Sequence, residues 1–408
     1  MSLSTGSPDA NSPGPFNFAA TPHIHYGVGE RARLAGLAET FATGNRRDVL
    51  LVTGGHSFDA SAMCMELLDG LSAIFDVHRL KVAGEPSPEL VDAAVREFHA
   101  CDPCCVIAIG GGSAVDAAKA IAGLLPGGDS VMEYLEGVGK GRTYRGPATP
   151  FIAVPTTAGT GGETSKNAVL SVIGEKGFKK SFRDEALVAR HIVLDPELTL
   201  SCPPEVTAAC GMDAFTQLLE SYVSGRANPM TDALAASGMR LVRDHLVTAV
   251  ERGSDLPARS SMLYASAISG LTLANAGLGS VHGLASPMGA FFPIPHGVVC
   301  GTLLYAASRL NIVAMQAREP HNPGLRKYAD TGRLLADDVS LGDQAALSGL
   351  LEILEGWCVR LEMRRLGEYG VREADIPRIV AGSRGNSMQT NPIVLTDEEI
   401  ADLIRCRL

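Results

Sequence analysis

The stretch VIAIGGGSAVDAAKAIAGLL (residues 106–125) joins a short apolar run, three glycines and a helical pattern. It predicts a strand, a tight turn and a helix, the repeating unit of parallel sheets. Three more apolar runs of strand length end in turn residues: DVLLVTGG (48–55), FIAVPTTAGTGGE (151–163) and HIVLDPELT (191–199). Because such strands are apolar on both faces and separated by helices, we expect a parallel sheet covered on both sides.

The pattern changes after Pro203 and Pro204. Segments 211–224, 230–253 and 260–277 place apolar residues at the i, i+3, i+4 spacing of amphipathic or buried helices. Near the end, Thr396 and Glu399 stand at the spacing of a capping box and indicate the start of a last helix. The second half of the chain is therefore expected to be all-helical.

The length of 408 residues predicts two domains, since a single core stops growing at ~250–300 residues. We expect a flexible tail rich in Ser, Pro and Gly over residues 1–20, an α/β domain over 21–202 and a helical domain over 203–408.

The composition excludes several classes of partner. A net charge of −10 gives no attraction to nucleic-acid phosphates or anionic membranes. The sequence has no apolar run long enough for a membrane span and no secretory signal. Nine scattered cysteines, an odd number, are expected to be reduced thiols, which predicts a cytoplasmic protein.

Two glycine-rich turns are candidates for phosphate binding. GGGSAVDAAKA (110–120) opens a helix, whose first N–H groups and positive dipole end attract phosphate. PTTAGTGGE (155–163) adds the hydroxyls of Thr156, Thr157 and Thr160 at the end of another strand. Ligands of open α/β sheets bind outside the carboxyl ends of the strands, which favours binding over the alternative of two plain turns.

The stretch GMDAFTQLLESYVS (211–224) places Asp213 and Gln217 on one helix face. Farther along, His282 lies in a small-residue segment, and His296 follows Pro287, Pro293 and Pro295, which we expect to interrupt the helix. One carboxylate and two imidazoles suit a catalytic iron(II) or zinc. The alternative is that these side chains only hydrogen-bond within a helical core.

The chain resembles the iron-containing (group III) alcohol dehydrogenase family over nearly its whole length after residue 21. The resemblance rests on the two glycine-rich turns, on DPELTLSCPPEVTAACGMDA (195–214), on VHG (281–283) with PHG (295–297), and on the NP and LT pairs near the C-terminus. It implies a Rossmann-like dinucleotide-binding domain and an all-helical domain, the architecture shared with dehydroquinate synthases. The active site is then expected in the cleft between the two domains.

The resemblance also implies particular site residues. NAD or NADP would be bound by Gly111, Gly112, Ser113, Asp116, Thr156 and Thr157, with Gly54 and Thr160 beside it and Lys179 or Lys180 near the ribose. The family's metal ligands, an Asp and three His, fall on Asp213, Gln217, His282 and His296. Gln217 therefore stands where the family has a histidine, and Ser286 stands where many members have another active-site histidine.

An amide oxygen is a weaker ligand for iron or zinc than an imidazole. Asp213, His282 and His296 are still enough for a catalytic site, so we expect a weaker metal site with Gln217 as a poor fourth ligand or an outer hydrogen-bonding group. The metal would act as a Lewis acid while hydride passes between substrate and nicotinamide, with Asp213 and His282 as catalytic residues. The alternative is a metal-independent reductase similar to maleylacetate reductases.

The acid that excludes NADP in many relatives is replaced by Gly54 at the end of the first predicted strand, so we expect NADP to be accepted. The expected substrate is a small alcohol or carbonyl compound, and a homodimer or larger homo-oligomer is expected from the family. Two further alternatives stay open. One is a dehydroquinate synthase-like lyase that uses NAD transiently, and the other is a non-catalytic nucleotide-binding protein.

Overall fold

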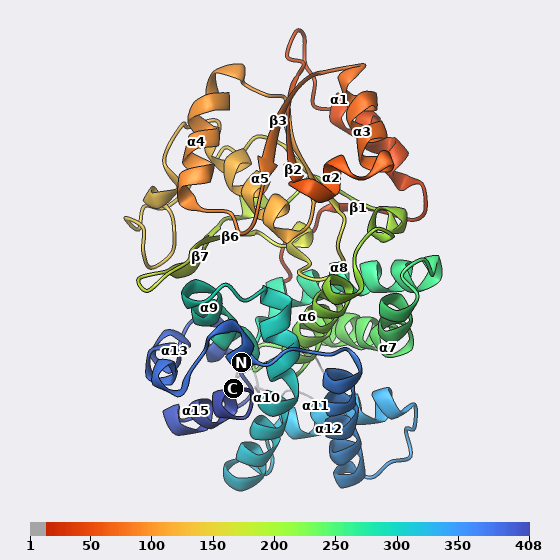
Figure 1. Ribbon diagram of the computed structural model, residues 1–408, viewed down its shortest axis with the longest axis vertical. Coiled ribbons are helices and arrows are strands. Elements are labelled where there is room, and N and C mark those ends of the chain that lie inside the picture. Colours follow the sequence, from red (N-terminus) through yellow and green to blue (C-terminus); the bar gives the residue numbers. More distant parts are fainter. Residues whose placement is uncertain (1–13) are drawn as a thin grey trace, which may run out of the picture.

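The computed structural model describes residues 14–408, and Figure 1 shows an α/β part next to a helical part. The α/β part contains a six-stranded, fully parallel sheet with the strand order β1-β8-β5-β4-β2-β3. Its strands are β1 (His23–Tyr26), β2 (Asp48–Gly54), β3 (Asp76–Val82), β4 (Cys105–Gly110), β5 (Phe151–Pro155) and β8 (His191–Leu194). The four predicted strands are the four inner strands, and the predicted parallel sheet is confirmed.

Both faces of the sheet are covered, because alternate residues of the inner strands point to opposite sides. Leu50 and Val52 of β2 pack with α4 (Pro88–Phe98) and α5 (Gly112–Leu124). Val49 and Leu51 pack on the other side, with α1 (Leu34–Glu39) and α3 (Ala62–Ser72). In Figure 1 these two pairs of helices flank the strands, and the short α2 (His56–Asp59) follows β2.

Four strands were not predicted. The edge strands β1 and β3 carry polar residues in HIHY and DVHRLKV, because an edge strand is only partly covered. An antiparallel hairpin of β6 (Asn167–Val172) and β7 (Phe178–Arg183) lies outside the main sheet. β6 mixes buried and half-buried residues and β7 has a single buried residue, so neither has the continuous apolar run of the inner strands.

The second half of the chain is helical, as predicted. Its helices are α6 (Pro204–Val223), α7 (Pro229–Glu251), α8 (Leu256–Ala276), α9 (Ser280–Phe291), α10 (His296–Arg318), α11 (Pro323–Ala336), α12 (Asp343–Arg360), α13 (Ile376–Gly382), α14 (Asn386–Gln389) and α15 (Asp397–Arg405). They enclose one large apolar core. The predicted capping box opens α15, with the Thr396 hydroxyl accepting from the Glu399 N–H.

The prediction that Pro287 interrupts the helix is wrong, because α9 continues through it to Phe291. Pro287 removes one helical hydrogen bond, but it is buried and packs against Gly382, which offsets that loss.

Among residues 14–408, only α10 is long and apolar enough to cross a membrane, and 72% of its most apolar stretch is buried inside the fold. That burial is typical of a core helix.

The predicted boundary near residue 202 stays a prediction, as does the flexible tail. Residues 14–20 have no regular secondary structure, and the Ala19 N–H donates to Asn275 Oδ1 at 2.6 Å. The rest of the predicted tail lies outside the described residues. All nine cysteines fall within the described part of the chain, and none of them forms a disulfide.

The loop after β5 is held on two sides. From α8, Gly270 approaches so closely that a Cβ there would lie 2.0 Å from the Gly161 carbonyl oxygen. Gly161 has a φ of +59°, which glycine adopts without strain. From α5, the buried Lys119 ammonium donates to the carbonyls of Gly162, Ser165 and Asn167 at 2.5, 2.8 and 2.7 Å. This loop therefore connects the sheet to the helical part.

Replacing Gly270 by Ala should destabilise the protein, because the added methyl group overlaps the backbone of the neighbouring loop. Overpacking of this kind typically costs about 1–3 kcal/mol. The matched control is Gly349→Ala in α12, where a Cβ meets nothing within 4 Å. This control should be neutral or stabilising by up to about 1 kcal/mol. Thermal unfolding midpoints measure both, and equal midpoints for the two variants would contradict the contact.

Candidate active site

A cavity of about 1260 Å³ lies between the carboxyl ends of the strands and the helical part. Residues from both parts line it. They include every residue that the sequence predicted for a cofactor or a metal: Gly54, Gly111, Gly112, Ser113, Asp116, Thr156, Thr157, Thr160, Lys179, Asp213, Gln217, His282 and His296. The structure therefore brings the predicted site residues together, while their individual roles remain predictions.

The nucleotide half of the cavity is built from the turns after β4 and β5. α5 begins at Gly112 after the N-cap Gly111, which has no side chain to bind the first N–H groups of the helix. A Cβ on Gly112 would lie 3.0 Å from Thr160 Oγ1, and one on Gly111 would lie 3.4 Å from Thr157 Oγ1. Glycines thus let the two turns meet and leave a helix N-terminus facing the cavity, which suits a phosphate.

Two charged residues lie close to these turns. Burial raises the pKa of Asp116 to about 7, against the opposing effect of Lys119. Lys179 on β7 forms an ion pair with Glu85, with 2.9 Å between Nζ and Oε2. Ser286 on α9 donates to the Lys179 carbonyl at 3.0 Å, which joins this strand to the helical part. Lys179 is thereby held at the cavity wall with a carboxylate partner.

The helical half contains a compact group of metal-binding side chains from three helices. Asp213 comes from α6, His282 from α9 and His296 from the first turn of α10, and Cys300 follows one turn later on α10. Asp213 Oδ1 lies 3.3 Å from His282 Nε2 and 3.8 Å from His296 Nε2. The donor atoms of all four lie within 4.8 Å of one another. A carboxylate and two imidazoles at this spacing fit a divalent metal.

The protonation of this group follows from its burial and its neighbours. Burial raises the pKa of Asp213, but His296 and His282 outweigh it and bring that pKa to about 2. Burial also lowers the pKa of His296 to about 4. The pKa of His282 is lowered by burial but raised more strongly by Cys300, Asp213 and Glu220, so it lies well above its usual value. Asp213 is consequently an anion at neutral pH.

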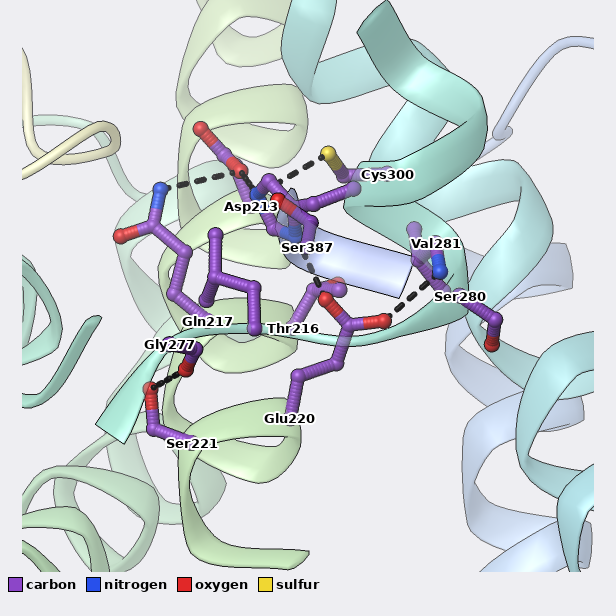
Figure 2. Close-up of polar contacts among 12 residues, drawn as sticks. Asp213, Thr216, Gln217, Glu220, Ser221, Gly277, Ser280, Val281, Cys300 and Ser387 are labelled. Atoms are coloured by element: carbon purple, nitrogen blue, oxygen red, sulfur yellow. Dashed lines mark hydrogen bonds and ion pairs between the residues drawn. The ribbon is translucent and has the colours of Figure 1, made fainter. Parts of the chain in front are cut away.

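Glu220 orients His282, a role that the sequence did not reveal. Its Oε2 lies 2.7 Å from His282 Nδ1, and its Oε1 accepts the Val281 N–H at 2.7 Å. Figure 2 shows the bond from Glu220 to Val281. A carboxylate behind a histidine fixes its ring and leaves the other nitrogen for a metal. The sequence could have indicated Glu220 by its spacing, since it lies seven residues after Asp213 on the same helix face.

Gln217 faces Asp213, as the spacing predicted, but through its amide nitrogen. Nε2 donates to Asp213 Oδ1 at 3.2 Å, the contact drawn in Figure 2. Its Oε1 accepts from the Ser269 hydroxyl at 2.7 Å. An amide N–H is not a metal ligand. This orientation favours the outer hydrogen-bonding role over the role of poor fourth ligand, which remains a prediction.

Replacing Glu220 by Gln should weaken metal binding by about 10- to 100-fold, because His282 loses its anionic partner. The affinity is measured by zinc titration against a chelating dye. Glu205→Gln is the matched control, since Glu205 is exposed in the first turn of the same helix. It should leave the affinity unchanged. An unaltered affinity in the Glu220 variant would contradict the orienting role.

Comparison with known protein families gives two matches. The family model described as "Iron-containing alcohol dehydrogenase" matches residues 21–196. The model described as "Fe-containing alcohol dehydrogenase family, C-terminal" matches residues 207–408. Between them the two models span nearly the whole described chain.

Individual relatives agree with these matches. The chain is 32% identical to the NAD-dependent methanol dehydrogenase of Bacillus methanolicus over 328 residues, which covers 80% of this chain and 82% of that protein. A crystal structure of 1,3-propanediol oxidoreductase is 27% identical, covers 97% of this chain and 100% of that one, and has a TM-score of 0.86. The sulfoacetaldehyde reductase of Bifidobacterium kashiwanohense in complex with NAD+ is also 27% identical, with coverages of 96% and 98% and a TM-score of 0.81.

Proposed function

Since this chain belongs to the iron-containing alcohol dehydrogenase family, we propose that it interconverts a small alcohol and its carbonyl compound with NAD or NADP. It is an oxidoreductase of the alcohol dehydrogenase type. One observation carries the assignment of the site. A single cavity joins a helix N-terminus suited to phosphate with a buried carboxylate–imidazole cluster suited to a metal. Hydride transfer requires a cofactor and a polarised substrate oxygen side by side.

The residues around the first turns would hold the cofactor. The N-terminus of α5, with Gly111, Gly112 and Ser113, would bind the phosphates through backbone N–H groups. The hydroxyls of Thr156 and Thr157 line the same cavity and can hydrogen-bond the cofactor. Lys179 also lines the cavity and would lie near the ribose, with Glu85 holding its ammonium group. Together these residues would hold the cofactor in the part of the cavity that adjoins the sheet.

Asp213, His282 and His296 would hold a divalent metal, iron(II) or zinc. When bound, the metal would supply a Lewis acid to the substrate oxygen and the nicotinamide would carry the hydride. Asp213 contributes a negative charge that is 1% exposed, and Glu220 keeps the His282 ring in place. Burial of this cluster limits competing water and strengthens each electrostatic contact.

Ser286 cannot transfer a proton in the way that a histidine at this position would. Its hydroxyl donates to the Lys179 carbonyl and so serves to join α9 to β7. The proton of the alcohol would then leave through water, a ribose hydroxyl of the cofactor, or His282 when no metal is bound to it. The cluster itself retains a histidine, His296, whose Nδ1 has no hydrogen-bond partner among residues 14–408.

The first test is elemental analysis of unchelated protein, followed by NAD(P)-linked alcohol oxidation before and after addition of iron(II) or zinc. About one metal per chain, with activity restored after chelation and readdition, is the expected result. Carbonyl reduction by protein that binds no metal would instead favour the metal-independent reductase. The absence of any net change in nicotinamide absorbance would contradict the dehydrogenase and favour a lyase.

Cofactor choice should depend on Gly54 at the end of β2, where a Cβ would meet only Ser57 Oγ, at 3.4 Å. A like charge about 4 Å from the 2′-phosphate costs roughly 1–4 kcal/mol. Gly54→Asp is therefore expected to raise the KM for NADP at least about fivefold and to leave the KM for NAD nearly unchanged. Gly54→Asn is the uncharged control of the same shape. Similar KM values for NADP in the two variants would contradict the charge effect.

The same proposal covers the assembly, the location and the partners of the protein. We expect a homodimer or larger homo-oligomer in the cytoplasm, acting on a small alcohol or carbonyl substrate, without nucleic-acid or membrane partners. The net charge of −10 supports the absence of nucleic-acid binding.

A further inference from the structure

Cys300 is the fourth donor at the carboxylate–imidazole cluster. We propose that its thiolate is a metal ligand of this chain and supplies the donor that position 217 lacks. The inference rests on the proposed function, because it requires a divalent metal at Asp213, His282 and His296. In this proposal the fourth ligand comes from α10 in place of α6, and it is a sulfur in place of the imidazole that the family resemblance implies.

The distances between the donor atoms agree with a single tetrahedral ion. With metal–nitrogen and metal–oxygen bonds of about 2.0 Å and a metal–sulfur bond of about 2.3 Å, tetrahedral N and O donors lie about 3.3 Å apart, and sulfur lies about 3.5 Å from nitrogen. Cys300 Sγ lies 3.6 Å from His282 Nε2 and 3.8 Å from His296 Nε2. His282 Nε2 lies 3.3 Å from Asp213 Oδ1.

Close packing of α10 on α6 brings the sulfur to this position. Cys300 is four residues after His296, so both side chains lie on one face of α10. That face packs very closely on α6. A Cβ at Gly297 would lie 2.4 Å from the Ala209 carbonyl oxygen, and one at Gly301 would lie 2.9 Å from Met212 Cβ. These two glycines allow the close approach that directs Cys300 toward Asp213, as Figure 2 shows.

A buried cysteine is usually a small apolar residue of the core. Cys358 on α12 is such a residue, since it is buried and its thiol donates to the Gly301 carbonyl at 3.3 Å. Cys300 differs, because its sulfur faces two imidazole nitrogens in a cavity-lining cluster that also contains a carboxylate. Its exposed fraction is 0%, so the thiol has no access to solvent as an alternative partner.

The environment of Gln217 agrees with this exchange of ligands. The amide nitrogen of Gln217 points to Asp213, and Ser269 holds the amide oxygen away from the cluster. Gln217 can therefore stabilise Asp213 as a ligand without binding the metal. Metal binding would replace the proton of the Cys300 S–H group by a sulfur–metal bond, and the released proton would leave through the adjoining cavity, which His282 and His296 line. No oxidant or reductant is needed.

Cobalt(II) substitution of the full-length protein tests the ligand directly. Thiolate-bound cobalt(II) has an intense near-ultraviolet charge-transfer band that nitrogen and oxygen ligands do not give. We expect this band in the unmodified protein and in Cys358→Ser, the matched buried control. Cys300→Ser should lose the band and bind cobalt(II) at least about tenfold more weakly. Circular dichroism verifies that the variants are folded, and Cys300→Ala provides a second, apolar replacement.

A double variant tests whether a histidine at position 217 can replace the lost sulfur ligand. If position 217 lacks a donor, Gln217→His in the Cys300→Ser background should restore much of the lost cobalt affinity without the thiolate band. Stoichiometric cobalt binding without the band in the unmodified protein would overturn the role of Cys300 while leaving the proposed metal function intact. Failure of the unmodified protein to bind cobalt, zinc or iron would overturn both.

Discussion

The buried carboxylate of Asp213 is the constraint around which the helical half is arranged. A charge that is 1% exposed is costly unless other groups compensate it. Compensation comes from His282 on α9, His296 on α10 and the Gln217 amide on α6. The N-terminal ends of α9 and α10 must therefore meet the middle of α6 at one point.

Glycines make this meeting possible. Gly297 and Gly301 allow α10 to pack on the backbone of α6, and Gly270 on α8 contacts the loop after β5. The first contact assembles the carboxylate–imidazole cluster, and the second joins the helical part to the glycine-rich loop of the sheet. Substrate chemistry at this site thus depends on backbone packing as much as on the polar side chains. The same close approach explains how a thiol, with a short side chain, reaches a site where the family uses histidines from other positions.

Much of the fold was predictable from sequence, and the reasons are local. The inner strands β2, β4, β5 and β8 are apolar on both faces, and the glycine turns that follow β4 and β5 mark the nucleotide side. Strands β1, β3, β6 and β7 were missed because partly exposed strands carry mixed residues. The motifs singled out Asp213, His282 and His296, which the structure brings together, and their roles stay predictions. Glu220, Cys300 and the orientation of Gln217 were not predicted. They depend on contacts between helices, such as the one from Ser269 to the Gln217 amide.

Lys119 has a consequence for the energetics of cofactor binding. Its buried ammonium group donates to the carbonyls of Gly162 and Ser165 in the loop after β5 and to that of Asn167 at the start of β6. The loop is therefore preorganised, so its conformational entropy is lost during folding and not when the nucleotide arrives. Binding of NAD or NADP then requires little loop closure, and differences in affinity between the two nucleotides reflect their direct contacts with the cavity.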